Sequence, residues 1–323
     1  MATSALAKQL VIIAIACCCF ASTSLQAADD YQVPRNEFGQ PDFSGTWSYA
    51  SLTLLERPDG FDTLTLDGAQ AQPFINGFLS SVEELGDPDT FIGEVNSLME
   101  VEGAYRSSVI IDPPDGKLPL NEQAAEVVAA VSARRQSFAG PETRDLDERC
   151  LGSIGYPPLM TFIVEIPSKI VQTAEYVMIK TEDPTVARII RLTEDHSVVG
   201  HRTFAGSSTG RWESNTLVVT TSHFRDDELT RLAIASNLII GPNAIITERF
   251  TRISESQLHY EYTVNDADHY SQPWTGEFVM KSIEDALYEY SCHEGNYSMA
   301  GILAGNLRQQ LVEEMPTKEN TDQ

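Results

Sequence analysis

Cationic side chains are scarce in this sequence. Its 323 residues include 22 lysines and arginines against 47 aspartates and glutamates, so the formal net charge is −25. An electrostatic field of that sign repels nucleic acid and anionic membrane surfaces. We therefore expect no nucleic-acid partner. The charge leaves uncharged ligands open, and many exported proteins are acidic simply for solubility.

Several common catalytic signatures are also missing. The sequence has no glycine-rich phosphate loop followed by lysine, no His-Glu-x-x-His and no Cys-x-x-Cys. The 6 histidines are scattered, and no two of them stand four residues apart as helical metal ligands do. The sequence therefore predicts neither a metal site nor a bound cofactor.

Long apolar runs are absent apart from one near the N-terminus. Val11–Phe20 follows Lys8 and precedes Leu25-Gln26-Ala27, the order of a secretory signal peptide. The run is shorter than the roughly 20 residues that cross a bilayer, and no later stretch could form a membrane helix. We predict a signal peptide over 1–27 and a periplasmic or secreted protein. The alternative is a lipoprotein modified at Cys17 or Cys18.

Cysteine is rare in the mature chain. Of 5 cysteines, three belong to the leader, and Cys150 and Cys292 remain. An oxidising compartment and an even count favour a disulfide between them, and the alternative is two buried thiols. Because the closed loop is long, the bond is expected to stabilise the fold near the upper end of about 2–5 kcal/mol.

Short runs of β-branched and aromatic residues alternate with turn residues over much of the chain. The predicted strands are 105–111, 170–173, 176–179, 187–192, a hairpin over 209–221 with its turn at 213–215, a pair over 244–253 and 257–264, and a final pair over 274–283 and 286–292. They predict a mainly β fold, an antiparallel meander that closes into a barrel-like sheet of the lipocalin or calycin type. No linker divides 28–323, which we expect to be one domain.

Helices are predicted in three places. Apolar residues recur at spacings near 3.6 on both sides of a break at 86–89, so the insertion at about 67–100 is read as two short helices. A third helix, at about 121–135, has Asn121 as its N-cap. A C-terminal helix is expected over 301–314.

Two polar segments near the C-terminus carry the candidate chemistry, 265–274 and 291–297. In each, a histidine lies near a carboxylate, and histidine can both accept and donate a proton near neutral pH. At a barrel mouth above an apolar interior, burial would raise the pKa of a carboxyl group. The predicted acid–base residues are His293 and Glu294, with Asp266 or His269 as the second group. The alternative is that all four are turn and strand-end residues.

Arginines on the predicted strands could contact a ligand. If Arg211 and Arg249 point inward, each needs a carboxylate partner, because an unpaired buried charge is costly. If they point outward, they form an ion-pair ladder worth little. Both alternatives stay open at this stage. The predicted ligand-binding residues are Arg211, Trp212, Glu248, Arg249, Trp274, Asn296 and Tyr297.

The motifs as a set resemble those of a known family. They are Ser44-Gly45-Thr46-Trp47, Asp112-Pro113-Pro114-Asp115-Gly116, Gly210-Arg211-Trp212-Glu213 with Thr216-Leu217-Val218-Val219, Glu248-Arg249-Phe250-Thr251-Arg252, and the stretch from Tyr288 to Tyr297. Through them the chain resembles a large family of secreted bacterial proteins found in acidobacteria and proteobacteria. The resemblance covers nearly the whole mature chain and implies an exported protein, but it implies no settled activity. The insertion at 66–103 is longer and more helical than in that family, so we expect it to form a lid or a ligand-specific wall.

Three functions fit these observations. The first is a cofactor-independent lyase, dehydratase, isomerase or cyclase that moves protons on a small apolar or aromatic molecule. The second is a non-catalytic carrier of the same kind of molecule. The third is a secreted structural or interaction protein with a filled core. An enzyme needs ionisable groups that converge in a cavity, whereas a carrier needs an apolar cavity with few of them.

Overall fold

The computed structural model describes residues 31–84, 95–152, 154–182, 187–195, 197, 200–233 and 236–314. The predicted signal peptide, 1–27, lies outside these residues. The chain divides into two units, Met1–Gln32 and Val33–Gln323, and all of the described helices and strands belong to the second unit.

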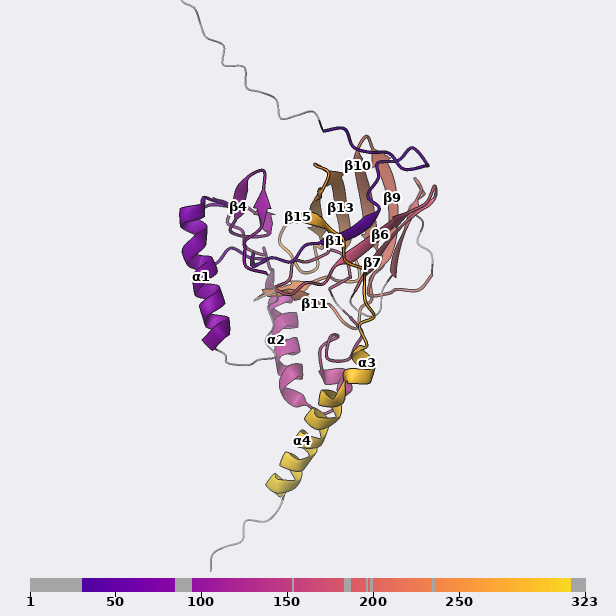
Figure 1. Ribbon diagram of the computed structural model, residues 1–323. Coiled ribbons are helices and arrows are strands. Elements are labelled where there is room, and N and C mark those ends of the chain that lie inside the picture. The colour runs from indigo at the N-terminus through magenta and orange to yellow at the C-terminus, as the bar shows by residue number, and fades with distance from the viewer. Residues whose placement is uncertain are drawn as a thin grey trace, which may run out of the picture. The chain divides into compact units, whose positions relative to one another are not determined.

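Nine described strands form a closed barrel (Figure 1). They are β1 (Gly45–Ser48), β6 (Ser168–Gln172), β7 (Tyr176–Thr181), β8 (Ala187–Leu192), β9 (Ser207–Glu213), β10 (Thr216–Ser222), β13 (Ile245–Arg252), β14 (Gln257–Asn265) and β15 (Trp274–Ile283), in that order around the sheet. Closure comes from β1, which pairs with β6 on one side and with β15 on the other. The predicted barrel-like β fold is thus confirmed.

One pair of strands departs from an antiparallel meander. β8 and β9 run parallel, whereas every other neighbouring pair around the described barrel is antiparallel. A parallel pair needs a long crossover, and the connection 193–206 provides it. The pair is short, since only 190–192 and 208–210 face each other.

Side chains alternate across the barrel wall. Along β14 the buried residues are Leu258, Tyr260, Tyr262 and Val264, while the residues between them are half-buried. Inside the barrel, the Tyr260 ring packs against those of Phe250 and Phe278, each at 4.7 Å between centroids. Aromatic rings therefore occupy part of the barrel interior, where we predicted a ligand cavity from the sequence.

The insertion adds one helix and a small sheet outside the barrel. α1 (Gly68–Glu84) precedes β3 (Glu100–Val101), which forms a three-stranded sheet with β2 (Thr65–Leu66) and β4 (Ala104–Arg106), and β5 (Ile110–Asp112) extends the barrel sheet beside β15. The first predicted helix is therefore present. Residues 95–99 are irregular and lead into β3, so the second predicted helix does not include them, and 85–94 lie outside the described residues. The strand predicted at 105–111 is interrupted between β4 and β5.

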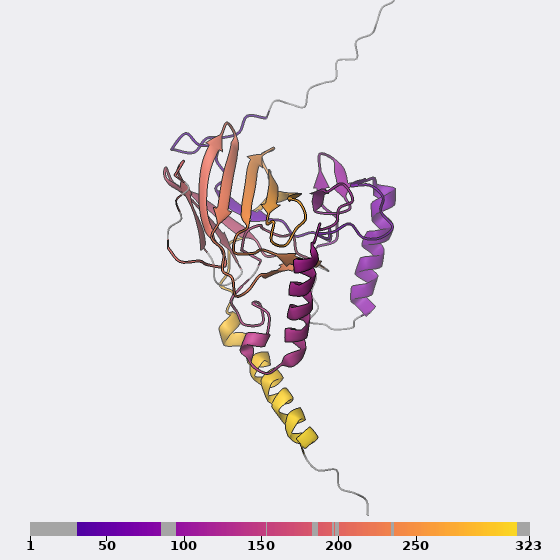
Figure 2. The ribbon, with the colours of Figure 1, turned by 180° about the vertical axis from the view of Figure 1, so that it is seen from behind.

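The remaining described elements are not part of the barrel sheet (Figure 2). They are α2 (Glu122–Ser137), the 3₁₀ turn η1 (Pro141–Thr143), the hairpin of β11 (Thr230–Ala233) and β12 (Ser236–Ile239), α3 (Cys292–Gly295) and α4 (Tyr297–Glu314). Asn121 caps α2 as predicted, since its side chain accepts the N–H of Ala124 at 3.0 Å. The strand predicted at 286–292 is not formed: Tyr288 and Tyr290 stand exposed in an irregular segment before α3.

Candidate functional site

Asp266 and His269 lie beside the start of α2. The backbone N–H of Asn121 donates to the carbonyl oxygen of His269 at 3.0 Å. Asp266 Oδ2 accepts the N–H of Gly241 at 2.8 Å and lies 2.9 Å from His269 Nδ1. Both side chains are buried. The pair therefore fastens the 241–244 turn and the N-terminus of α2 to the end of β14.

His293 and Glu294 lie in α3, beyond the other end of α2. The first residue of α3 is disulfide-bonded to Cys150, in the chain that follows α2. In that chain, Arg144 Nη1 donates to the carbonyl oxygen of Arg135, in the last turn of α2, at 2.7 Å. A helix of 16 residues is about 24 Å long. The structure thus separates the two pairs predicted to act together, and it leaves His293 and Glu294 exposed.

The predicted ligand-binding arginines form an outward ladder. Arg211 Nη2 lies 2.6 Å from Glu213 Oε1, and Arg249 Nη2 lies 3.1 Å from Glu213 Oε2. The two arginine side chains are 36% and 40% exposed. Of the two alternatives, the structure has the outward one, in which exposed pairs add little stability.

The aromatic residues of the predicted set are divided between core and surface. Trp212 packs edge-on against Phe43 at 5.2 Å. Trp274 is fully buried beside Tyr262 at 5.6 Å. Tyr297 is 84% exposed at the start of α4. None of these three side chains faces another predicted ligand-binding residue across a hollow.

Glu248 has a partner that sequence reasoning missed. Arg188, on β8, donates from Nη1 to Glu248 Oε1 at 2.8 Å and also contacts Oε2 through Nη2. Arg188 Nε donates to Ser208 Oγ at 3.0 Å, and Tyr260 Oη donates to Glu248 Oε1 at 2.8 Å. Burial, with the charge of Glu248, holds the pKa of Tyr260 well above its usual value. Because these groups satisfy one another inside the barrel, they brace its wall.

A hollow of about 320 Å³ lies against the disulfide. We call it the disulfide hollow. Its lining residues are Asp147, Cys150, Gly152, Ile154, Phe162, Val164, Glu165, Ile166, Glu182, Tyr290 and Cys292. The volume falls at the lower end of the range of ligand pockets, about 300–1,000 Å³, and an apolar wall with a few polar groups is typical of them. Both bonded cysteines belong to the wall, so the disulfide predicted from sequence is confirmed and lies at this hollow.

Two glutamates of the lining, Glu165 and Glu182, lie at the open end of the β6–β7 hairpin. The backbone N–H of Glu182 donates to the carbonyl oxygen of Pro167 at 3.0 Å, which prolongs the pairing of the two strands beyond Ser168 and Thr181. Glu165 lies just before β6, where its Oε2 accepts the hydroxyl of Ser48 at 2.6 Å. The barrel thus fixes one rim of the hollow, and the disulfide fixes the other.

The two glutamates affect each other. Burial raises the pKa of Glu182, and the negative charge of Glu165 raises it further. A hydrogen bond from the backbone of Tyr288 acts in the opposite direction. Glu182 therefore holds its proton to a higher pH than an ordinary glutamate. Paired carboxyls in an apolar hollow are a common arrangement at functional sites.

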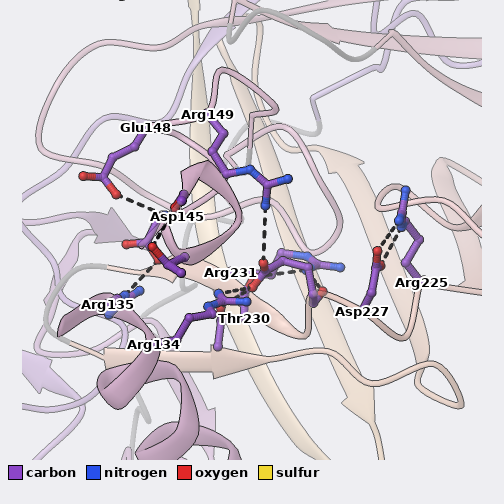
Figure 3. Close-up of polar contacts among 12 residues, drawn as sticks. Arg134, Arg135, Asp145, Glu148, Arg149, Arg225, Asp227, Thr230 and Arg231 are labelled. Carbon is purple, nitrogen blue, oxygen red and sulfur yellow. Dashed lines mark hydrogen bonds and ion pairs between the residues drawn. The ribbon is translucent and has the colours of Figure 1, made fainter. Parts of the chain in front are cut away.

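Ion pairs hold the chain that carries Cys150 (Figure 3). Arg135 Nε, in α2, lies 2.8 Å from Asp145 Oδ1. Arg144 makes a two-pronged contact with Glu148, at 3.0 and 3.1 Å. Burial is the largest influence on the pKa of Glu148 and raises it, but the hydrogen bonds and the charge of Arg144 outweigh burial and leave the pKa lowered. The disulfide hollow therefore has a wall that is fixed to α2.

A second hollow of about 340 Å³ adjoins the first and shares Asp147, Tyr290 and Cys292 with it. Asn296, a predicted ligand-binding residue, lines this neighbour, and its Nδ2 donates to the carbonyl oxygen of Glu148 at 2.8 Å. Sequence reasoning missed Glu165 and Glu182. A usable signal was their place at the open end of the predicted hairpin over 170–179.

No family model matches the chain, and no curated protein or solved structure matches it. Among the described residues, no group of three or more His, Cys, Asp or Glu side chains comes together as a metal site. Within the same part of the chain, the helices are all too short or too polar to cross a membrane.

Proposed function

We propose that this chain is an exported protein that binds a small molecule in the disulfide hollow. The ligand has an apolar or aromatic body and a protonated amine. The observation that carries the proposal is the lining itself, in which Asp147, Glu165 and Glu182 stand among apolar and aromatic residues. No Lys, Arg or His is among the described lining residues.

Charge decides the class of ligand. Two glutamates close enough for one to raise the pKa of the other repel each other when both are ionised. A bound ammonium group removes that repulsion and gains charge-assisted hydrogen bonds. The rings of Phe162 and Tyr290 can face the apolar body of such a ligand, and aromatic faces also attract cations. A bound anion would meet only repulsion from the described lining.

Export is part of the proposal. The leader at 1–27 supports it, and the Cys150–Cys292 bond is weakly consistent with an extracellular or periplasmic location. The family resemblance of the motifs points the same way.

A second candidate function is acid–base catalysis on the same small molecule. The raised pKa of Glu182 favours it, because a carboxyl that keeps its proton nearer to neutral pH can donate it, and Glu165 could then act as the base. In this candidate the glutamates take the roles that the sequence gave to His293 and Glu294. Proton NMR of a probe incubated with the protein separates the two functions, since a carrier leaves the probe unchanged and an enzyme converts it.

Calorimetric titration tests the proposal with phenethylamine and its uncharged counterpart, phenethyl alcohol. We expect the amine to bind more tightly, and Glu182→Gln to weaken amine binding by about tenfold, as for loss of one charge-assisted hydrogen bond. Alcohol binding should not change. Glu175→Gln is the matched control, because it removes an exposed charge at the opposite end of the same hairpin. Equal affinity for the two probes, or equal effects of the two variants, would overturn the proposal.

A further inference from the structure

A larger hollow, of about 510 Å³, lies where β8 and β9 separate. The parallel pair covers only 190–192 and 208–210, so Ala187–Ile189 at the start of β8 have no partner on β9. We call this space the lateral hollow. Its lining residues are Tyr156, Tyr176, Ala187, Arg188, Ile189, Arg191, His201 and the segment from Thr203 to Ser208. It shares no described lining residue with the disulfide hollow.

One wall of the lateral hollow is a fixed pair of aromatic rings. Tyr156 and Phe204 lie 5.7 Å apart between centroids. The guanidinium of Arg225 lies 4.7 Å from the Phe204 ring centre. Arg231 donates from Nη2 to the carbonyl oxygen of Phe204 at 3.3 Å and lies 5.7 Å from the Tyr156 ring centre. These contacts fix the positions of both rings.

The backbone beside that wall is also constrained. Gly206 has φ +67°, and a Cβ there would come within 2.7 Å of the carbonyl oxygen of Ser222 and 2.8 Å of the Phe224 ring. Only glycine permits this conformation and this approach. The chain from Thr203 to Ser208 is therefore pressed onto β10, and the space in front of it stays open.

The charge of the lateral hollow is opposite to that of the whole protein. Its lining has two arginines and a histidine, and the described lining includes no Asp or Glu, although the chain carries a net charge of −25. Arg188 is committed to Glu248. Arg191 is half-buried and donates from Nη2 to the carbonyl oxygen of Ser197 at 2.7 Å. A guanidinium has five N–H donors, so Arg191 can also bind an anion.

We infer that the lateral hollow is a second binding site, and that it takes a small aromatic carboxylate. The aromatic wall and the exposed side chains of Tyr176 and Ile189 provide surface for a ring. Arg191 and His201 provide donors for the carboxylate, and arginine suits a carboxylate because both oxygens can be bound at once. This site is independent of the amine site proposed above, because the two linings differ in residues and in sign.

The test uses benzoate and its uncharged counterpart, benzamide, titrated into the full-length mature protein and followed by two-dimensional NMR. We expect benzoate to bind more tightly and to shift resonances of residues lining the lateral hollow. Arg191→Gln should weaken benzoate binding by about tenfold and leave benzamide binding unchanged. Phe204→Leu should weaken the binding of both probes, because it removes ring surface without changing charge.

Two control variants make the result decisive. Arg211→Gln removes an exposed cation from the outward ladder and should leave benzoate binding intact. Glu182→Gln, in the disulfide hollow, should also leave it intact, so failure of the amine site and failure of this site are told apart. The inference is overturned if benzamide binds as tightly as benzoate, or if Arg191→Gln and Arg211→Gln have the same effect.

Discussion

The buried pair of Arg188 and Glu248 gives the sharpest prediction about the fold. Their side chains are 2% and 0% exposed, so water screens neither charge. Glu248→Gln keeps the size of the side chain but leaves the guanidinium of Arg188 without a counter-charge. Removal of one partner from a buried ion pair costs about 3–5 kcal/mol. We therefore expect the variant to lose about that much of its free energy of unfolding.

Urea unfolding at neutral pH, with the disulfide intact, measures this loss. The chain has 3 tryptophans, and Trp47 and Trp274 are fully buried, so fluorescence reports the transition. Glu213→Gln is the control, since it removes the same kind of charge from an exposed ladder and should change the free energy of unfolding much less. If Glu248→Gln were as mild as this control, the reasoning about the barrel interior would be refuted.

Two further predictions concern the cross-links of the fold. Replacing Cys150 and Cys292 with serine should lower the free energy of unfolding by up to about 5 kcal/mol, the chain-entropy value for residues 142 apart. Denaturant unfolding measures this loss, and an unchanged midpoint would contradict the prediction. Gly241→Ala should lower the melting temperature, because the new Cβ would come within 2.6 Å of the His269 ring and 2.9 Å of the Asp266 carboxylate. Overpacking of this kind costs about 1–3 kcal/mol. An unchanged melting temperature in calorimetry would contradict the pairing of Asp266 with His269.

The sequence predicts most of the barrel because its signals are local. Hairpin turns lie between their strands, as at Ser214-Asn215 between β9 and β10, and two-residue alternation identifies strands that have one buried face. The N-cap at Asn121 and the α4 helix depend on neighbouring residues in the same way. The disulfide could be predicted because only two cysteines follow the predicted signal peptide.

The candidate site could not be predicted in this way, because it depends on contacts between distant segments. The spacing of apolar residues in a sequence identifies strands but does not say which strand lies beside which. The parallel pairing of β8 with β9, and the lateral hollow beside it, therefore could not be predicted. The run 286–292 is rich in tyrosine, yet β15, its predicted partner, is already paired with β14 and β1. The sequence pattern favoured His293 because it lies in a polar segment, whereas Glu182 lies at a strand end, and its pKa is raised by burial and further by the charge of Glu165.

The pH dependence of phenethylamine affinity tests the disulfide hollow most directly. The amine stays protonated from pH about 4 to 8, as a lysine side chain does. Since the pKa of Glu182 is raised, affinity should be full above that pKa and should fall as the pH drops through it, because the proton then competes with the ammonium group. Glu182→Gln should remove this step. The same pH profile in both proteins would contradict the account.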